Sequence, residues 1–211
     1  MYTITCTSEL TGNRIAQKYG TAAFHGLECQ DNFLVVVLMY ATDLKLIVRD
    51  QVTLSPSLVI HQQSIGAAHH TEGWRIPADG VLGVGPVALT LGTLTPDTSS
   101  LVPTVTNNLF MQHTIPVESV AFYFEPTNNI FSRNGEMMFG GTDSTRYTEP
   151  IQYVGYTNMD DPENKEWTID ASIRYGDQVI LAAITALVDT GYTRVSIATG
   201  KLALYAVRMN Y

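Results

Sequence analysis

The stretch "ALVDTGYTRVSIAT", Ala186–Thr199, places an Asp-Thr-Gly triplet directly behind an apolar run. Residues 186–188 predict a short strand that ends in a tight turn and projects Asp189. Gly191 permits a close backbone approach in such a turn, and Thr190 offers a hydroxyl. The triplet is also ordinary turn chemistry, so a structural turn and a functional carboxylate both stay open on these residues alone.

The composition favours a globular chain built mainly of strands. Of the 211 residues, 45% are hydrophobic and 15% are charged, which allows a sizeable core in one large domain or two small ones. Val, Ile and Tyr are frequent, and Thr, Ser, Asn and Gln dominate the polar residues. This mixture suits short strands joined by turns, so we expect an all-β fold with a few short helices.

Local patterns predict the individual elements. One helix is expected in "PTVTNNLFMQH", with Val105, Leu109 and Gln112 on one face and Thr104 capping its start. Asn-Gly at 134–135 and Gly-Asp at 176–177 predict hairpin turns. The predicted strands are short runs bounded by Gly, Pro, Asn or Asp: 35–40, 45–48, 57–65, 80–84, 120–124, 136–139, 151–154, 167–175, 178–180 and 186–188.

Charge and apolar patterning exclude two classes of partner. The net charge is −8 and the 12 Lys and Arg residues are dispersed, so we expect no nucleic-acid surface. The longest apolar run, "FLVVVLMYA" at Phe33–Ala41, is about half the length of a membrane-spanning helix and predicts a buried strand instead. The N-terminal "MYTITCTSEL" lacks the basic start and apolar centre of a secretory signal.

Metal, nucleotide and nucleophile motifs are not found. Cys6 and Cys29 have neither zinc-site nor redox spacing, and their pairing stays open. His69 and His70 are adjacent, so on a strand they point to opposite faces. The glycines of "GVLGVG", Gly80–Gly85, have the reverse of dinucleotide-binding spacing, and no G-x-S-x-G motif occurs. We therefore expect no metal and no cofactor.

Longer stretches carry a resemblance. They are "DGVLGVGPVALTLGTLTPDTSSLVPTVTNNLF", "SVAFYFEPTNNIFSRNGEMMFGGTDSTRYTEPIQYVGYT" and "WTIDASIRYG" leading into "VDTG". In this order they closely resemble the pepsin-like aspartic proteases (peptidase family A1), and within them the fungal polyporopepsin branch. The resemblance covers about Tyr19–Gly26 and Asp50–Thr199.

The resemblance implies a bilobal enzyme in which each lobe contributes one Asp-Thr-Gly turn to a shared cleft. In that family, two neighbouring carboxylates share a proton and activate a water that attacks the peptide bond. The partner would be an extended polypeptide substrate, with no nucleic acid, membrane or cofactor involved. The resemblance further implies a monomeric, extracellular protein.

Site residues follow from the matched positions. Asp189, Thr190 and Gly191 resemble the catalytic turn of the second lobe, and Tyr19, Gly20 and Thr21 resemble the tip of the flap that closes over substrate. Gly80–Gly85 resembles the segment that supports the first-lobe aspartate.

The chain also departs from the family pattern. Eighteen residues precede Tyr19 and contain no Asp, so the first Asp-Thr-Gly has no counterpart. Ala22, Tyr192 and Arg194 replace a glycine, a Ser or Thr, and an apolar residue. Leu27–Val48 and residues 200–211 match nothing in the resemblance. We expect an incomplete first lobe at 1–145 and an incomplete second lobe at 146–211, and we hypothesise unspliced or mispredicted gene structure.

Three functions remain open from the sequence. The first is an aspartic endopeptidase acting at acidic pH, impaired because one catalytic aspartate is absent. The second is a catalytically inactive pepsin-like module that binds peptides. The third is a retroviral-type arrangement in which two identical chains each donate Asp189.

Overall fold

The computed structural model describes residues 9–19, 22–30, 46–72, 81–129, 132, 134–157, 166–192 and 195–197, and side chains from residue 51 onward except those of 67–72. The chain divides into two compact units, Met1–Glu149 and Pro150–Tyr211. The lobes expected at 1–145 and 146–211 stay a prediction.

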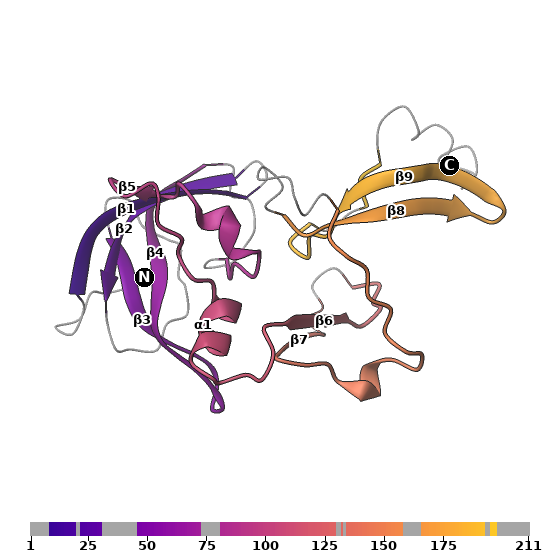
Figure 1. Ribbon diagram of the computed structural model, residues 1–211, viewed down its shortest axis with the longest axis horizontal. Helices are drawn as coiled ribbons and strands as arrows, with labels where there is room; N and C mark the ends of the chain where they lie inside the picture. Colours follow the sequence, from indigo (N-terminus) through magenta and orange to yellow (C-terminus); the bar gives the residue numbers. More distant parts are fainter. Residues whose placement is uncertain are drawn as a thin grey trace. The chain divides into compact units, whose positions relative to one another are not determined.

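The first unit is built on a five-stranded sheet with the order β3-β4-β2-β1-β5 (Figure 1). Its strands are β1 (Glu9–Tyr19), β2 (Ala22–Gln30), β3 (Leu46–Ser55), β4 (Leu58–Glu72) and β5 (Leu94–Thr95). Neighbours in this order pair antiparallel, and Gln30 adds one parallel pair with Arg49. β1 and β2 form a hairpin, which the sequence predicts only around its tip.

The segment without a counterpart in the sequence resemblance contributes to this sheet at both ends. Residues 27–30 continue β2 and pair with β1, and residues 46–48 begin β3 and pair with β4. These ends are therefore integral to the ladder. The strand predicted at 35–40 lies outside the described residues.

The predicted helix is confirmed as α1, Val105–Met111. Thr104 is its N-cap, and the Thr104 N–H donates to Asn107 Oδ1 at 3.1 Å. This bond gives the first turn a partner for one of its free N–H groups. Val105 and Leu109 are buried, as their shared face predicts.

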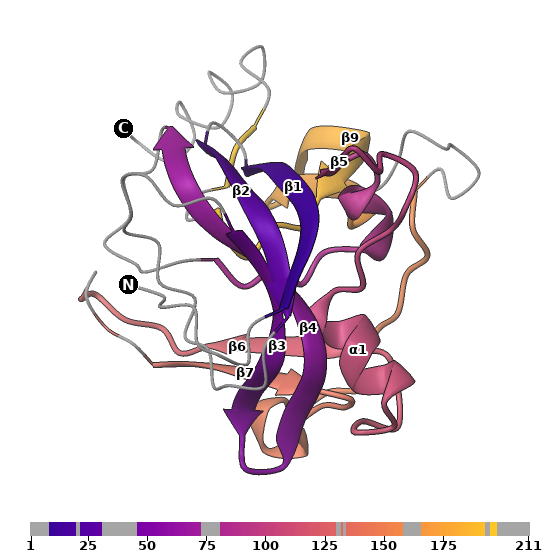
Figure 2. The same cartoon turned by 90° about the vertical axis from the view of Figure 1, so that its left-hand side faces the viewer.

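Helix α1 packs against β4, and the two elements lie side by side in both views (Figures 1 and 2). Gln112 binds the backbone of His61 at two points: the His61 N–H donates to Oε1 at 2.9 Å and Nε2 donates to the His61 carbonyl at 2.8 Å. Asn108 Nδ2 donates to the buried Gln63 at 2.9 Å. Val105 and Leu109 of α1 belong to a buried core cluster together with Val52, Ile60, Ile65, Ile115 and Phe139.

The rest of the first unit contains two short 3-10 helices and a strand pair. The helices are η1 (Val87–Thr90) and η2 (Ser144–Arg146), and the pair is β6 (Val120–Phe124) with β7 (Gly135–Phe139). β6 and β7 are antiparallel from Val120↔Phe139 to Phe124↔Gly135. The predicted pairing of these two strands is confirmed. The predicted Asn-Gly turn at 134–135 is wrong, because Gly135 already belongs to β7 and the connection between the strands is residues 125–134.

The second unit contains the hairpin of β8 (Thr168–Tyr175) and β9 (Gln178–Leu187). The last pair is Tyr175↔Gln178, so Gly176-Asp177 is the predicted two-residue turn. Gly176 has φ +56°, the conformation that glycine adopts without steric cost at the first position of such a turn.

Several strand predictions are wrong. Residues 81–84, between two glycines and before Pro86, form no strand, and residues 151–154 after Pro150 are exposed and pair with no described strand. The runs at 178–180 and 186–188 are parts of the single strand β9. The described chain nevertheless consists mostly of strands with one α-helix, as the all-β prediction states. No helix in the described part is long and apolar enough to cross a membrane.

Candidate active site

Strand β9 carries the chain to the Asp-Thr-Gly triplet. Its last ladder pair is Thr168↔Leu187, and the Val188 N–H then donates to the Trp167 carbonyl at 2.8 Å. The backbone is therefore held up to the residue before Asp189. The sequence predicted the strand but gave no sign that Trp167 supports it.

The triplet forms a tight turn around the Asp189 carboxylate. The Gly191 N–H donates to Asp189 Oδ1 at 2.8 Å, and the Tyr192 N–H approaches the Asp189 carbonyl at 3.4 Å. A Cβ at position 191 would lie 3.2 Å from Oδ1, which is a tight contact, so glycine suits this position. Asp189, Thr190 and Gly191 are exposed.

The base of the hairpin is anchored by residues that no sequence motif marks. Thr157 donates from its N–H to the Thr168 carbonyl at 2.9 Å and from its hydroxyl to Asp170 Oδ1 at 2.9 Å. The rings of Tyr156 and Trp167 lie 5.1 Å apart between centroids. No local sequence pattern around Thr157 points to this contact, because its partners Thr168 and Asp170 lie 11 and 13 residues further along the chain.

Tyr192 occupies the position where the resemblance places Ser or Thr. Its phenol oxygen lies 3.1 Å from Ser196 Oγ, which donates to it, and the side chain is 57% exposed. The tyrosine hydroxyl is thus engaged with Ser196. Arg194 lies outside the described residues.

The predicted flap lies in the first unit. Tyr19 pairs with Ala22 as the last pair of the β1–β2 hairpin, which leaves Gly20 and Thr21 as the connection. Those two residues lie outside the described part, as does the side chain of Tyr19. In the segment resembling the aspartate support, Leu82 and Val84 pack against the core of the first unit.

No candidate metal site is found among the described residues. They contain no group of three or more His, Cys, Asp or Glu side chains that could hold an ion. A polar cavity of about 260 Å³ lies in the first unit, where Asp97, Asn108 and His61 are among its lining residues. None of the residues expected for the site lines it. The structure thus brings Asp189, Thr190 and Gly191 together in one turn.

Comparison with known proteins places the chain in a family. The family model "Eukaryotic aspartyl protease" matches residues 37–210. The chain is 42% identical to Polyporopepsin of Irpex lacteus over 205 residues, covering 97% of this chain and 54% of that protein. It is 26% identical to Cathepsin E-B of Xenopus laevis over 200 residues, covering 92% of this chain and 42% of that protein.

A solved structure agrees with the sequence comparisons. The crystal structure of the aspartic proteinase from Irpex lacteus matches with a TM-score of 0.82 and 42% identity, covering 99% of this chain and 55% of that chain. The chain therefore spans about half the length of these relatives. The family model also runs through residues 37–48 and 200–210, so the expectation that these residues have no counterpart in the family is wrong. The expected pepsin-like fold and its fungal relative are confirmed, and the chain belongs to the eukaryotic aspartyl protease family.

Proposed function

We propose that this chain acts in the hydrolysis of peptide bonds at acidic pH, as an aspartic-type endopeptidase in which Asp189 is one of two catalytic carboxylates. The observation that carries the proposal is the exposed Asp189 carboxylate, held at the end of β9 by the Gly191 N–H at 2.8 Å. This bond fixes one oxygen of the carboxylate.

The chemistry follows from like-charge repulsion. Two carboxylates at hydrogen-bonding distance cannot both ionise easily, so they share one proton. The ionised member takes a proton from water, and the water oxygen attacks the peptide carbonyl carbon. The protonated member donates to the carbonyl oxygen, which gives a tetrahedral diol. The proton taken from water then passes to the amide nitrogen, and the C–N bond breaks to release the amine and the carboxylic acid. Asp189 can fill either role, while Thr190 and Gly191 hold the turn.

The proposal includes impaired activity for the chain on its own. The sequence contains one Asp-Thr-Gly triplet, at residues 189–191. General acid–base catalysis by a positioned group contributes about 10²–10⁴-fold, so half a dyad retains little of the rate. The substrate would be a polypeptide, with Tyr19, Gly20 and Thr21 as its proposed flap residues, and the proposed protein is an extracellular monomer.

The single triplet also favours a second candidate, a catalytically inactive pepsin-like module that binds peptides. Tyr192 supports this candidate, because its hydroxyl is engaged by Ser196 at 3.1 Å. A Ser or Thr at that position, as in the resemblance, would carry its hydroxyl closer to the backbone of the turn.

The experiment is a proteolysis assay of the purified chain at acidic pH, with and without a pepstatin-like inhibitor. We expect slow, inhibitable cleavage of a denatured protein substrate that disappears in Asp189→Asn. Asp177→Asn is the matched control, because it changes an exposed aspartate in the β8–β9 turn of the same unit.

The outcomes separate the candidates. Cleavage that persists in Asp189→Asn contradicts the assignment of Asp189. Peptide binding without cleavage supports the inactive module. Cleavage with a rate that rises as the square of the chain concentration supports the arrangement of two identical chains.

A further inference from the structure

The polar cavity of about 260 Å³ in the first unit contains none of the residues proposed for peptide cleavage. Its walls come from β4, from α1 and its C-cap, and from the connection between β5 and α1. A cavity of this volume is small for a drug-sized molecule, so it suits one small chemical group.

Strand β4 has a bulge at this cavity. Two of its residues, His61 and Gln62, lie opposite the single residue Gln51 of β3. Gln62 has φ +57°, a conformation that residues other than glycine rarely adopt. Gln112 bonds both the N–H and the carbonyl of His61, so it holds the bulge in place. Bulges of this kind turn side chains out of the strand ladder beside functional sites.

The amide side chains around the cavity use their donors within the protein. Asn108 Nδ2 donates to Gln63 Oε1 at 2.9 Å, and Gln63 Nε2 donates to the Pro103 carbonyl at 3.1 Å. Gln112 Nε2 donates to the His61 carbonyl at 2.8 Å. No donor from the described residues reaches Asn108 Oδ1. This part of the wall therefore presents an acceptor to a ligand.

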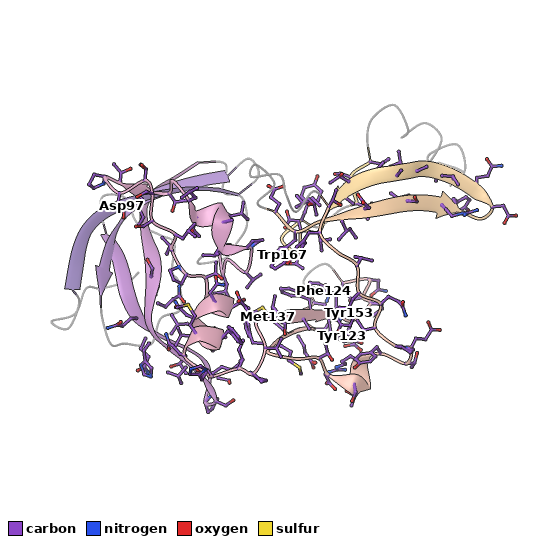
Figure 3. The ribbon with its side chains drawn as sticks, viewed as in Figure 1. Asp97, Tyr123, Phe124, Met137, Tyr153 and Trp167 are labelled. Atoms are coloured by element: carbon purple, nitrogen blue, oxygen red, sulfur yellow. The ribbon has the colours of Figure 1, made fainter. Side chains whose placement is uncertain are left out.

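Asp97 adds a negative charge to the same cavity, and Figure 3 labels it. Hydrogen bonds from the Ser100 side chain and then from Ser99 lower the pKa of Asp97 to about 2, so its carboxylate is ionised except in strong acid. The bonds from Ser99 and from the Ser100 N–H all reach Oδ1. A carboxylate has about four acceptor sites on two oxygens, so Oδ2 can accept from a ligand. The described residues that line the cavity include no Lys or Arg.

We propose that this cavity binds a primary ammonium group through Asp97 and Asn108. An ammonium is a compact charge with three donors, which suits one carboxylate oxygen and one amide oxygen. The planar fork of a guanidinium bonds best to both oxygens of a carboxylate, and Oδ1 of Asp97 is already occupied. Leu94, Leu101 and Pro103 also line the cavity and can contact the alkyl chain that carries the ammonium.

The ammonium can belong to a lysine side chain or to a free amine. A metal ion is a poorer occupant, because no group of three or more His, Cys, Asp or Glu side chains occurs in the part of the chain that the structure describes. The inference goes beyond the proposed peptidase function and does not depend on it.

The test is a titration of the full 211-residue chain with n-butylammonium chloride near neutral pH, followed by amide NMR signals. We expect saturable shifts of the Ser99, Ser100 and Asn108 signals with a dissociation constant of about 10 mM, since a small ligand at a partly exposed carboxylate binds weakly. Neither n-butanol, which has the same length without the charge, nor sodium chloride at equal ionic strength should shift these signals.

Asp97→Asn should weaken binding at least about fivefold, because the charge-assisted hydrogen bond is lost. The spectrum of this variant should keep the signals of α1 and β4, which separates a loss of binding from a loss of folding. Asp143→Asn is the matched control. Asp143 also accepts from the N–H and the hydroxyl of the residue two positions later, Thr145, at 2.8 Å each, but it does not line the cavity. It should leave the dissociation constant unchanged.

A second variant tests the contact with the alkyl chain. Leu101 lines the cavity and is 48% exposed. Leu101→Ala should weaken n-butylammonium about threefold and leave methylammonium within about twofold, because only the longer ligand reaches the apolar wall.

A second probe identifies the source of the ammonium. An acetylated and amidated alanine-lysine-alanine peptide carries the group on a polypeptide. Tighter binding of this peptide than of n-butylammonium identifies a lysine side chain as the ligand, and weaker binding identifies a free amine. Both results support an ammonium site.

Four results would overturn the proposal: no saturable shift, equal shifts with n-butanol or sodium chloride, equal binding by Asp97→Asn, and equal weakening by Asp143→Asn. Proteolysis is not measured, so an inactive Asp189 turn has no bearing on the outcome.

Discussion

Two aspartate turns in this chain begin alike and differ in what surrounds the carboxylate. Both Asp97 and Asp189 are followed by threonine. In each, Oδ1 accepts the backbone N–H of the residue two positions later: Ser99 at 3.0 Å and Gly191 at 2.8 Å. Local sequence therefore produces the same turn twice.

The donors around the two carboxylates differ. Oδ1 of Asp97 also accepts from the Ser99 hydroxyl at 3.0 Å and the Ser100 N–H at 3.1 Å. Hydrogen bonds from the Ser100 side chain and then from Ser99 lower the pKa of Asp97 to about 2. At Asp189 the residue two positions on is a glycine without a hydroxyl. The comparison teaches that Asp-Thr marks a turn, while the third residue and the preceding strand decide what the carboxylate can do.

The largest expected effect is on catalysis. Asp189→Asn should reduce inhibitor-sensitive cleavage at least about 100-fold, because the amide cannot serve as base or acid. Asp97→Asn should keep the cleavage rate within about twofold of the unmodified chain, because the Asp97 carboxylate accepts hydrogen bonds only from residues of its own turn. Initial rates on one protein substrate measure both. Equal losses in the two variants would remove the distinction between the turns.

A smaller loss is expected from Gly191→Ala. The added Cβ would lie 3.2 Å from Asp189 Oδ1, so the carboxylate must shift by a few tenths of an ångström. Misplacement of a reacting group is costly, and we expect about a tenfold loss of rate with little change in melting temperature. Gly155→Ala, in the same unit, is the control: a Cβ at Gly155 would meet no atom within 4 Å, so the rate should not change. An unchanged rate would show that the close approach of Gly191 is not needed.

Tyr192→Ser should produce a modest gain. It restores the hydroxyl residue of the family pattern beside Asp189 and releases Ser196, which now donates to Tyr192 at 3.1 Å. We expect cleavage to rise about threefold, because the serine hydroxyl can donate one additional hydrogen bond to the Asp189 carboxylate. The gain is small because water already supplies part of this bond. Tyr192→Phe, which lacks the hydroxyl, should not gain. Equal rates for the two variants would contradict the role given to the hydroxyl.

The smallest effect concerns the pH dependence of the Asp97 turn. Ser100→Ala removes the largest cause of the lowered pKa, so the pKa of Asp97 should rise from about 2 toward 3.8. A carboxyl with a lowered pKa stabilises the fold above the unfolded value, and this contribution is lost as pH falls through the folded value. Titration of the Asp97 carboxyl by NMR measures the change. Ser119→Ala, in the same unit, should leave the midpoint near 2.

The predictable parts of the fold are those whose signal lies within a few residues. Thr104 and the apolar pair Val105 and Leu109 sufficed to place α1. Gly176-Asp177 sufficed to place the β8–β9 turn. In each case the contacts join near neighbours in the chain, so a short window of sequence contains both partners. The Asp189 turn is of the same kind.

The strand predictions fail where strand formation depends on pairing with a segment that is far away in the sequence. Residues 151–154 have strand composition, yet a strand exists only when another backbone pairs with it, and here none of the described strands does. The flanks of 27–48 showed no resemblance, yet residues 27–30 and 46–48 are held in the sheet by β1 and β4. Composition cannot reveal these pairings.

The sequence by itself determined the family, the helix and the Asp-Thr-Gly turn. Each of these depends on residues that are close together in the chain, such as a short motif or a hydrogen bond between residues two positions apart. Only the tertiary structure decided that Trp167 holds Val188 in place and that Gln112 fastens α1 to His61. These features join residues far apart in the chain, and burial depends on which segments meet. That meeting is a property of the folded chain as a whole.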